Sequence, residues 1–168
     1  MGWHLSLNAT VESMKKAWYK ALINEELIGF IGAPSFPVAL SDHGVQMAKK
    51  TAKEFFKNLG IKQLFARYQT PTDNAWIESW FRILKYDWLR YKDYVSFEEL
   101  RTMLETFIDY YNNKRYHGSI GYVTPSQMHN GEAEGILEER KKRKEEARLK
   151  RLEVNRELNA PKQLREVA

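Results

Sequence analysis

Short apolar runs alternate with longer amphipathic patterns along most of this chain, and this alternation constrains the fold more than any other feature. A strand signal is a run in which apolar residues alternate with polar ones or stand together, whereas helical apolar residues recur every three or four positions. The order is strand 2–7, helix 11–24, strand 38–40, helix 45–59, strand 61–65, then helices near 73–88 and 96–111. Strands that alternate with helices in this way predict an α/β layered fold.

Capping residues mark where several of these helices are expected to begin. Thr72 or Asp73 can cap the helix that follows them, and Ser96 with Glu99 has the spacing of a capping box. Thr124 followed by proline predicts a further helix start, because proline is favoured at the first helical position.

The composition changes after about His129, where aromatic residues end and Lys, Arg and Glu interleave. Such a segment has few apolar side chains to bury, so it is typical of a solvated helix or a disordered tail. The chain is therefore predicted to have two parts, a folded domain over 1–129 and a charged helical or disordered tail over 130–168.

The overall composition limits the class of protein. A net charge of +5 favours a polyanionic partner, although basic charge alone does not specify nucleic acid. The absence of cysteine excludes a disulfide framework and a thiolate metal site. The sequence has no apolar run of the roughly 18 residues that span a bilayer and no signal-peptide pattern, so we expect a cytoplasmic protein without a membrane partner.

Two acidic residues on different elements are the candidate metal ligands. Asp42 follows the apolar run 38–40, and Glu78 lies in the next helical pattern but one, with thirty-five residues between the two acids. Carboxylates that converge in this way suit a hard divalent cation. Asp42 can equally serve a local turn with Gly44, although the carboxyl ends of strands are also where open α/β sheets place ligands. His43 is expected to be a turn or core residue.

The helix that carries Glu78 also carries Arg82 and Lys85. In a regular α-helix the three side chains lie within about 60° of one another. The simpler interpretation is a surface ion pair between Glu78 and Arg82. The functional interpretation is a metal-binding carboxylate flanked by cations that hold DNA phosphates.

A basic aromatic segment at 110–117 contains Lys114 and Arg115 among tyrosines and asparagines. It has the cations and rings to contact a DNA backbone, and it can also be a packed helix end. The basic run at 140–144 is interleaved with glutamates nearby, which favours a solvated helix over phosphate contacts.

Four sequence blocks resemble a known family. They are SDHGVQ at 41–46, EFFKNLGIKQLFAR at 54–67, TPTDNAWIESWFRILK at 70–85 and YYNNKRYHGSIGYVTPSQM at 110–128. In this order they resemble the integrase catalytic core of bacterial insertion-sequence transposases, relatives of retroviral integrases. The resemblance covers roughly residues 2 to 129.

The resemblance implies a ribonuclease-H-like fold and a DDE triad in which Asp42 is the second acid and Glu78 the third. Family members hold two divalent ions, normally Mg²⁺, and cut and join DNA by phosphoryl transfer. The partners implied are the DNA of element ends and target, within the nucleoid. Arg82 and Lys85 match positions that approach this DNA, and Lys114 and Arg115 are the further predicted DNA contacts.

The chain also departs from the family pattern. Its first strand signal, at 2–7, resembles the third strand of that fold, so the first acid and the first two strands are expected to be absent. We therefore expect a fragment of a DDE transposase with an incomplete Mg²⁺ site, inactive by itself. The alternatives are a non-catalytic DNA-binding or inhibitory partner of an intact transposase, and an inert remnant. Association with further copies is left open.

Overall fold

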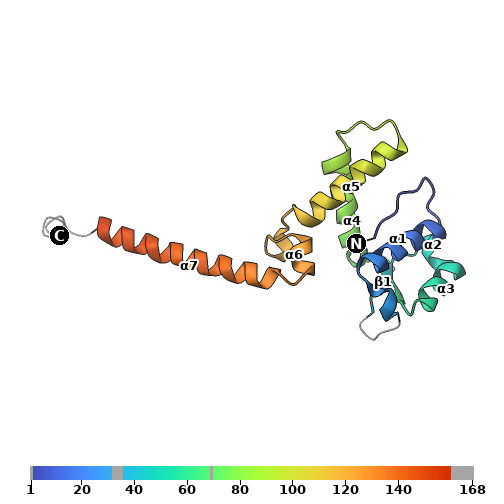
Figure 1. Ribbon diagram of the computed structural model, residues 1–168, viewed down its shortest axis with the longest axis horizontal. Helices are drawn as coiled ribbons and strands as arrows, with labels where there is room; N and C mark the ends of the chain where they lie inside the picture. The colour runs from blue at the N-terminus through green and yellow to red at the C-terminus, as the bar shows by residue number, and fades with distance from the viewer. Residues whose placement is uncertain (1, 32–35, 69, 160–168) are drawn as a thin grey trace. The chain divides into compact units, whose positions relative to one another are not determined.

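The computed structural model describes residues 2–31, 36–68 and 70–159 (Figure 1). Contacts between residues divide the chain into two compact units, Met1–Tyr94 and Val95–Ala168. The boundary that the composition placed between 129 and 130 stays a prediction.

The first unit combines a small sheet with short helices. Its elements are α1 (Val11–Asn24), η1 (Leu27–Phe30), β1 (Val38–Ser41), α2 (Val45–Ala48), α3 (Lys50–Asn58), β2 (Lys62–Phe65), η2 (Pro71–Asn74), α4 (Ala75–Arg82) and η3 (Ile83–Leu89). The two strands pair in parallel, with Val38 opposite Lys62 and Ser41 opposite Phe65. Strand predictions at 38–40 and 61–65 are thereby confirmed. Because the strands are parallel, their carboxyl ends meet at one edge of the sheet.

The strand predicted at residues 2–7 is wrong, because no part of 2–7 has strand structure. This segment instead packs against α1. A Cβ atom added to Gly2 would lie 2.2 Å from the Ala17 carbonyl oxygen, and the ring of Trp3 lies 4.5 Å from the Lys20 ammonium. Alternating residues need a neighbouring strand to complete their hydrogen bonds, and β1 pairs only with β2 among the described residues.

The helix predicted over 45–59 is divided between α2 and α3 at Lys49, which is extended with a ψ of 144°. A side chain of the sheet accounts for the break. The Gln63 amide donates a hydrogen bond of 3.2 Å to the Met47 carbonyl, which a continuous helix would bond to the Thr51 amide. α3 ends at Asn58, and Gly60 follows with a left-handed φ of 64°, which is typical of a helix end.

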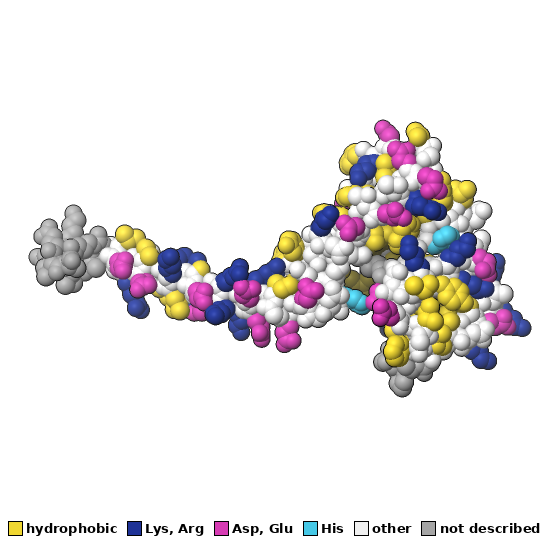
Figure 2. Space-filling model, viewed as in Figure 1, with side chains coloured by type: hydrophobic (Ala, Val, Ile, Leu, Met, Phe, Trp, Pro, Cys, Tyr) yellow, Lys and Arg dark blue, Asp and Glu magenta, His cyan; other side chains and the backbone are white. Residues whose placement is uncertain are grey.

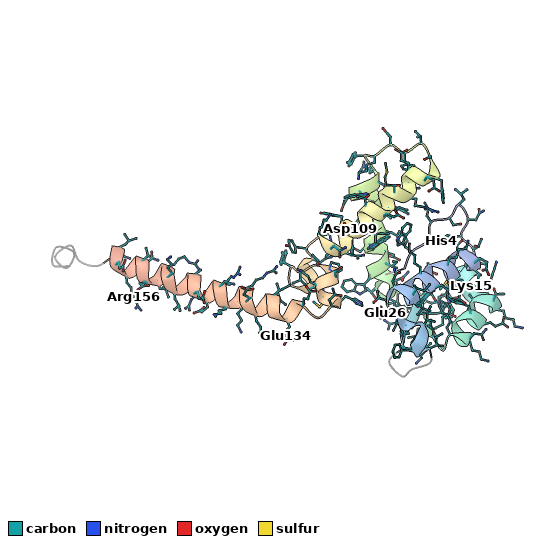
Figure 3. All side chains as sticks on the ribbon, in the orientation of Figure 1. His4, Lys15, Glu26, Asp109, Glu134 and Arg156 are labelled. Atoms are coloured by element: carbon teal, nitrogen blue, oxygen red, sulfur yellow. The ribbon has the colours of Figure 1, made fainter. Side chains whose placement is uncertain are left out.

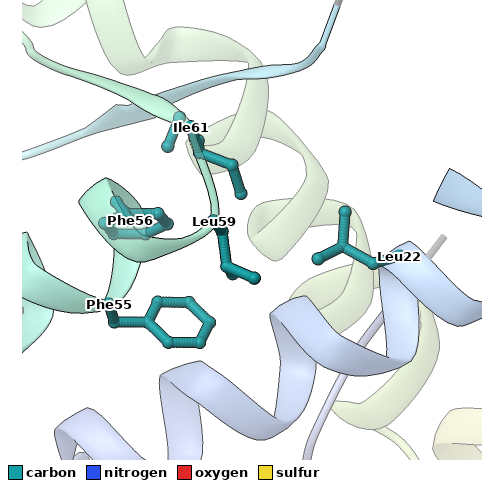
Figure 4. Close-up of a cluster of buried hydrophobic side chains, with 6 residues drawn as sticks. Leu22, Phe55, Phe56, Leu59 and Ile61 are labelled. Carbon is teal, nitrogen blue, oxygen red and sulfur yellow. The ribbon is translucent and has the colours of Figure 1, made fainter. Parts of the chain in front are cut away.

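The core of the first unit forms between α1, α3 and the sheet (Figure 4). Phe56 and Leu22 are each 1% exposed, and the ring of Trp18 meets that of Phe56 edge-on at 5.2 Å. Further buried members are Ala39 on β1 and, between α3 and β2, Leu59 and Ile61. This cluster fixes α3 against β1 and β2 and so sets the edge of the sheet at which Asp42 emerges.

The second unit is helical, with α5 (Phe97–Asn113), η4 (Gly118–Ile120), α6 (Pro125–His129) and α7 (Ala133–Leu158). Leu104 and Phe107 are buried on α5. The capping box predicted at Ser96 is only half formed. The Ser96 hydroxyl accepts the Glu99 amide at 3.1 Å, but the Glu99 carboxylate accepts the Val95 amide instead of that of Ser96.

The charged tail forms a long helix over the described part, as one of the two sequence interpretations expected. Ala133 is the buried residue of α7, and cationic and acidic side chains interleave along its surface (Figure 2). Across the described ranges of the chain, no helix has the length and apolar character needed to cross a bilayer.

Candidate functional site

Asp42 lies immediately after β1, at the carboxyl edge of the sheet, and its side chain is exposed. One carboxylate oxygen, Oδ1, accepts the Gly44 amide at 2.9 Å. This is the local turn that the sequence offered as the simpler role of Asp42. The second oxygen, Oδ2, bonds to none of the described residues, so a turn role and a ligand role are compatible.

His43 has a structural contact next to Asp42. Its Nε2 lies 2.8 Å from the Ala66 carbonyl oxygen, and because a carbonyl can only accept, Nε2 carries the proton. The ring is stacked with those of Phe65 and Tyr68, at centroid distances of 5.3 and 4.3 Å. His43 lies in a bend after β1, which is the turn role expected from the sequence, but its side chain is exposed and does not join the core. Its contacts reach residues at and after the end of β2.

Arg67 and Asp73 form a paired contact that the sequence interpretation missed. The Asp73 carboxylate accepts hydrogen bonds from Arg67 Nε at 3.0 Å, Nη2 at 2.8 Å and the backbone amide at 2.9 Å. These bonds, the side-chain ones above all, lower the pKa of Asp73 to about 2. The sequence signal for this contact is a pair of opposite charges six residues apart. That separation is not a helical or strand spacing, so it does not by itself predict a contact.

The cap predicted for the helix of Glu78 is wrong. Asn74 occupies the N-cap position of α4 and makes no side-chain capping bond, and a single 3₁₀ turn, η2, precedes the helix. Asp73 does not cap because its carboxylate is directed to Arg67.

Glu78 lies in the first turn of α4, with Arg82 at the end of the same helix, and both side chains are exposed. The ion pair between them, which was the simpler interpretation, does not form. In the described part of the chain neither side chain has an ion pair or hydrogen bond. Each is therefore open to a ligand.

Lys85 lies in η3, which is a π-helix, so the angle expected from a regular α-helix holds for Glu78 and Arg82 but not for Lys85. Its ammonium lies 6.0 Å from the ring centroid of Phe81.

Much of the apolar surface of α4 and η3 is uncovered. Leu84 is buried, but Ile77 and Phe81 are 44% and 45% exposed, and α4 itself has no buried residue among those described. Within the first unit α4 packs mainly against η2 and η3, which continue it at either end.

Lys114 and Arg115 lie in the second unit, where α5 ends. The Lys114 ammonium pairs with Asp109 at 3.2 Å. Figure 3 shows the position of Asp109 on α5. Arg115 is half-buried, with its guanidinium 5.7 Å from the ring centroid of Tyr111 and its Nη1 3.2 Å from His117 Nδ1. Burial, and secondarily the Arg115 charge, lowers the pKa of His117. Arg115 thus belongs to a packed helix end, whereas Lys114 is exposed.

The two proposed ligands have the right chemistry for a divalent ion, but they are only two. Asp42 and Glu78 offer hard carboxylate oxygens, and Mg²⁺ is commonly held by one or two carboxylates with water completing the shell. The described residues contain no group of three or more His, Cys, Asp or Glu side chains placed to hold a metal. The chemistry of the two carboxylates suits one divalent ion, and the described residues do not by themselves form a three-acid centre for two ions.

The fold combines helices with a small parallel sheet. Asp42 follows the first strand, and Glu78 lies on a later helix, α4. The sequence model described as the integrase core domain matches residues 59–125. Glu78 and the four predicted DNA-contacting cations lie inside the matched segment, and Asp42 lies before it.

The curated relatives are named for transposition. InsK of insertion sequence element IS150 in Escherichia coli K12, named as a transposase, is 31% identical over 94 residues, which cover 56% of this chain and 33% of InsK. The transposase for insertion sequence element IS904 of Lactococcus lactis is 27% identical over 89 residues, covering 52% of this chain and 35% of that protein. A transposase-like protein of Haemophilus influenzae is 29% identical, with 53% and 41% covered.

The resemblance to integrase cores of insertion-sequence transposases is therefore confirmed, and the chain spans 33 to 41% of the length of these relatives.

Solved structures resemble the fold. One is a chain of the cryo-electron microscopy structure of the simian T-cell lymphotropic virus intasome in complex with PP2A regulatory subunit B56 gamma. It has a TM-score of 0.56 and 17% identity, with 74% of this chain and 41% of that chain covered. The catalytic core domain of BIV integrase has a TM-score of 0.48 and 21% identity, with 76% and 75% covered. The first likeness shows a fold similar to an integrase catalytic core.

Proposed function

We propose that this chain carries part of the catalytic core of a DDE transposase, which cuts and joins DNA by metal-dependent phosphoryl transfer. The observation that carries the proposal is the integrase core match over 59–125, which includes Glu78 in an exposed and unpaired position among the described residues. The activity of a whole transposase is proposed here only by analogy, because the relatives are two to three times longer than the part they share with this chain.

Asp42 and Glu78 are proposed as the two carboxylates that hold a divalent ion, normally Mg²⁺. When bound, such an ion supplies Lewis-acid stabilisation of the phosphate and activation of the attacking oxygen. Asp42 can take this role without losing its turn, because only Oδ1 is used by Gly44. Glu78 needs to break no contact with a described residue before it binds the ion.

Four cations are proposed to hold DNA phosphates. Arg82 is the strongest candidate because its exposed guanidinium is unpaired in the described part of the chain and can bind a phosphate through two parallel hydrogen bonds. Lys85 and Lys114 are exposed point charges, although Lys114 must leave Asp109. Arg115 contributes through its exposed edge only, because its guanidinium packs over Tyr111.

A second candidate function is a non-catalytic DNA-binding partner that assembles with further copies or with a complete transposase. The favouring observation is that no group of three metal-ligating side chains occurs in the described ranges. Both candidates act on DNA, and we place either in the bacterial cytoplasm with the nucleoid, by analogy with the bacterial relatives.

DNA binding tests what the two candidates share. The full chain is titrated with a short fluorescent DNA duplex at several salt concentrations, alongside the double variant Arg82→Gln with Lys85→Gln. Because each lost phosphate contact removes roughly one unit of salt dependence, the slope should fall by about two and the affinity about tenfold at low salt. The matched control is Lys50→Gln with Lys57→Gln, which changes two exposed lysines of α3 and should bind as the natural chain does.

Nicking of supercoiled plasmid with Mg²⁺ separates the candidates. Nicking that Glu78→Gln abolishes supports catalysis, whereas DNA binding without nicking supports the partner role. Equal DNA affinity in the natural chain and the Arg82 and Lys85 variant would count against the DNA contacts proposed for both.

A further inference from the structure

The two proposed metal ligands lie on separate elements, so a shared ion requires something to fix one relative to the other. Asp42 follows β1, and Glu78 lies in α4 beyond the end of β2. Residues 66–70 connect β2 to η2, which precedes α4. A set of hydrogen bonds crosses from the residues around Asp42 to the start of that helix.

The first part of this set joins the neighbours of Asp42 to Ala66. The Ala66 amide donates to the Ser41 carbonyl at 2.8 Å, which extends the parallel ladder past the last residue of β2. The Ala66 carbonyl accepts His43 Nε2–H at 2.8 Å. Both polar groups of Ala66 are thus bonded to the residues on either side of Asp42, and Ala66 itself is 8% exposed.

The second part joins the next residue, Arg67, to the start of the helical segment. Three hydrogen bonds of 2.8 to 3.0 Å run from Arg67 to the Asp73 carboxylate, two from the guanidinium and one from the backbone amide. Exposed ion pairs commonly contribute little, but a two-pronged guanidinium contact with an added amide fixes direction as well as distance. The Asp73 side chain is only 19% exposed, whereas that of Arg67 is 76% exposed.

The third part is the continuity of the helix. Asp73 lies in η2, and η2 runs directly into α4, where Glu78 is five residues further on. The Asp73 amide also donates to the Thr70 carbonyl at 3.1 Å, which closes the turn before the helix. A shift of Asp73 would therefore move the first turn of α4 and the carboxylate of Glu78 with it.

We propose that His43, Arg67 and Asp73 are positioning residues that hold Glu78 in register with Asp42 for a shared divalent ion. The proposal rests on the proposed function, because it takes Glu78 to be a ligand. None of the three needs to touch the ion. Groups that orient metal ligands from behind commonly change metal affinity by tenfold or more when they are removed.

Mn²⁺ is the probe, because it takes the same oxygen ligands as Mg²⁺ and its binding to the full chain can be measured by calorimetry or by its paramagnetic signal. Glu78→Gln should abolish the site. Arg67→Gln and Asp73→Asn should each weaken Mn²⁺ binding about tenfold. The double variant should be no weaker than either single variant, because the two residues act through one contact.

Three further variants separate positioning from general stability. His43→Phe keeps a ring to stack between Phe65 and Tyr68 but loses the bond to Ala66, so it should weaken Mn²⁺ binding severalfold. Reversing the pair, Arg67→Asp with Asp73→Arg, should recover part of the affinity, which a loss of stability would not explain. Asp109→Asn, which removes an exposed ion pair in the second unit, should bind Mn²⁺ as the natural chain does.

The outcomes distinguish the two proposals. No Mn²⁺ binding by the natural chain, or binding that Glu78→Gln leaves unchanged, overturns the proposed function and this inference with it. Loss in Glu78→Gln with natural affinity in Arg67→Gln and Asp73→Asn overturns the positioning role alone. If Arg67→Gln is unfolded at the assay temperature, Arg67→Lys replaces it. Its Mn²⁺ affinity should be intermediate, because lysine keeps the positive charge and one hydrogen bond to Asp73.

Discussion

Asp73 is the residue whose ionisation the structure perturbs most clearly. Hydrogen bonds from Arg67 lower its pKa from 3.8 to about 2, because they are made to the charged carboxylate. As the pH falls, the unfolded chain therefore takes up this proton before the folded chain does. The contribution of Asp73 to stability is complete above about pH 4 and is lost as the pH falls towards 2.

This loss of stability at low pH can be measured. The free energy of unfolding of the natural chain should fall more steeply between about pH 4 and pH 2 than that of Asp73→Asn, which has no proton to gain. Urea denaturation at a series of pH values measures both slopes, and a carboxyl-carbon NMR titration gives the pKa of Asp73 directly. Identical slopes, or a pKa near 3.8, would show that the Arg67 contact is not formed in solution.

At the scale of elements, α6 has the most completely capped N-terminus of the described helices. The Thr124 hydroxyl accepts the Gln127 amide at 3.2 Å, and the Gln127 side chain accepts the Thr124 amide at 3.0 Å. Pro125 takes the first helical position, where its missing N–H costs nothing. The capping box satisfies two amides that the helix itself cannot.

Thr124→Ala removes this box and should destabilise the chain by about 1 to 2 kcal/mol in urea denaturation. Ser119→Ala is the control in the same unit, because its side chain is exposed and it does not cap a helix, so a change within about 0.5 kcal/mol is expected. Equal stability of the two variants would contradict a working capping box at Thr124.

The same scale explains what the sequence could predict. Local signals sufficed for α1, for both strands and for Thr124, because their caps and apolar spacing lie within a few residues. The break at Lys49 could not be foreseen, since it depends on Gln63 from another element. The strand prediction at 2–7 is wrong for a related reason. Whether a strand forms depends on a pairing partner elsewhere in the chain, and the residues of the strand do not identify that partner.

The candidate site divides in the same way. Asp42, Glu78 and the cations could be proposed from sequence blocks, because motifs preserve residue type and order. The Arg67–Asp73 contact could not, because Asp73 reads as a helix cap until the loop geometry directs it elsewhere. The sequence at 110–117 is compatible with both a DNA contact and a packed helix end, and the packing of Arg115 over Tyr111 appears only in the structure.

At the scale of the whole molecule, the integrase core match begins at Leu59, shortly before β2 in the first unit, and ends at Pro125 in the second unit. Asp42 precedes it, so the assignment of Asp42 depends on its place after β1 and on its sequence block. The central claim is therefore that Asp42 and Glu78 bind one ion together, and this is the part that neither acid establishes separately.

One measurement tests that claim most directly: Mn²⁺ affinity of the full chain compared with Asp42→Asn and Glu78→Gln, each made singly. If the two carboxylates share an ion, each variant should lose at least about tenfold in affinity, and the double variant should lose little more. Unchanged affinity in either single variant, or independent losses that add in the double variant, would contradict a shared metal site.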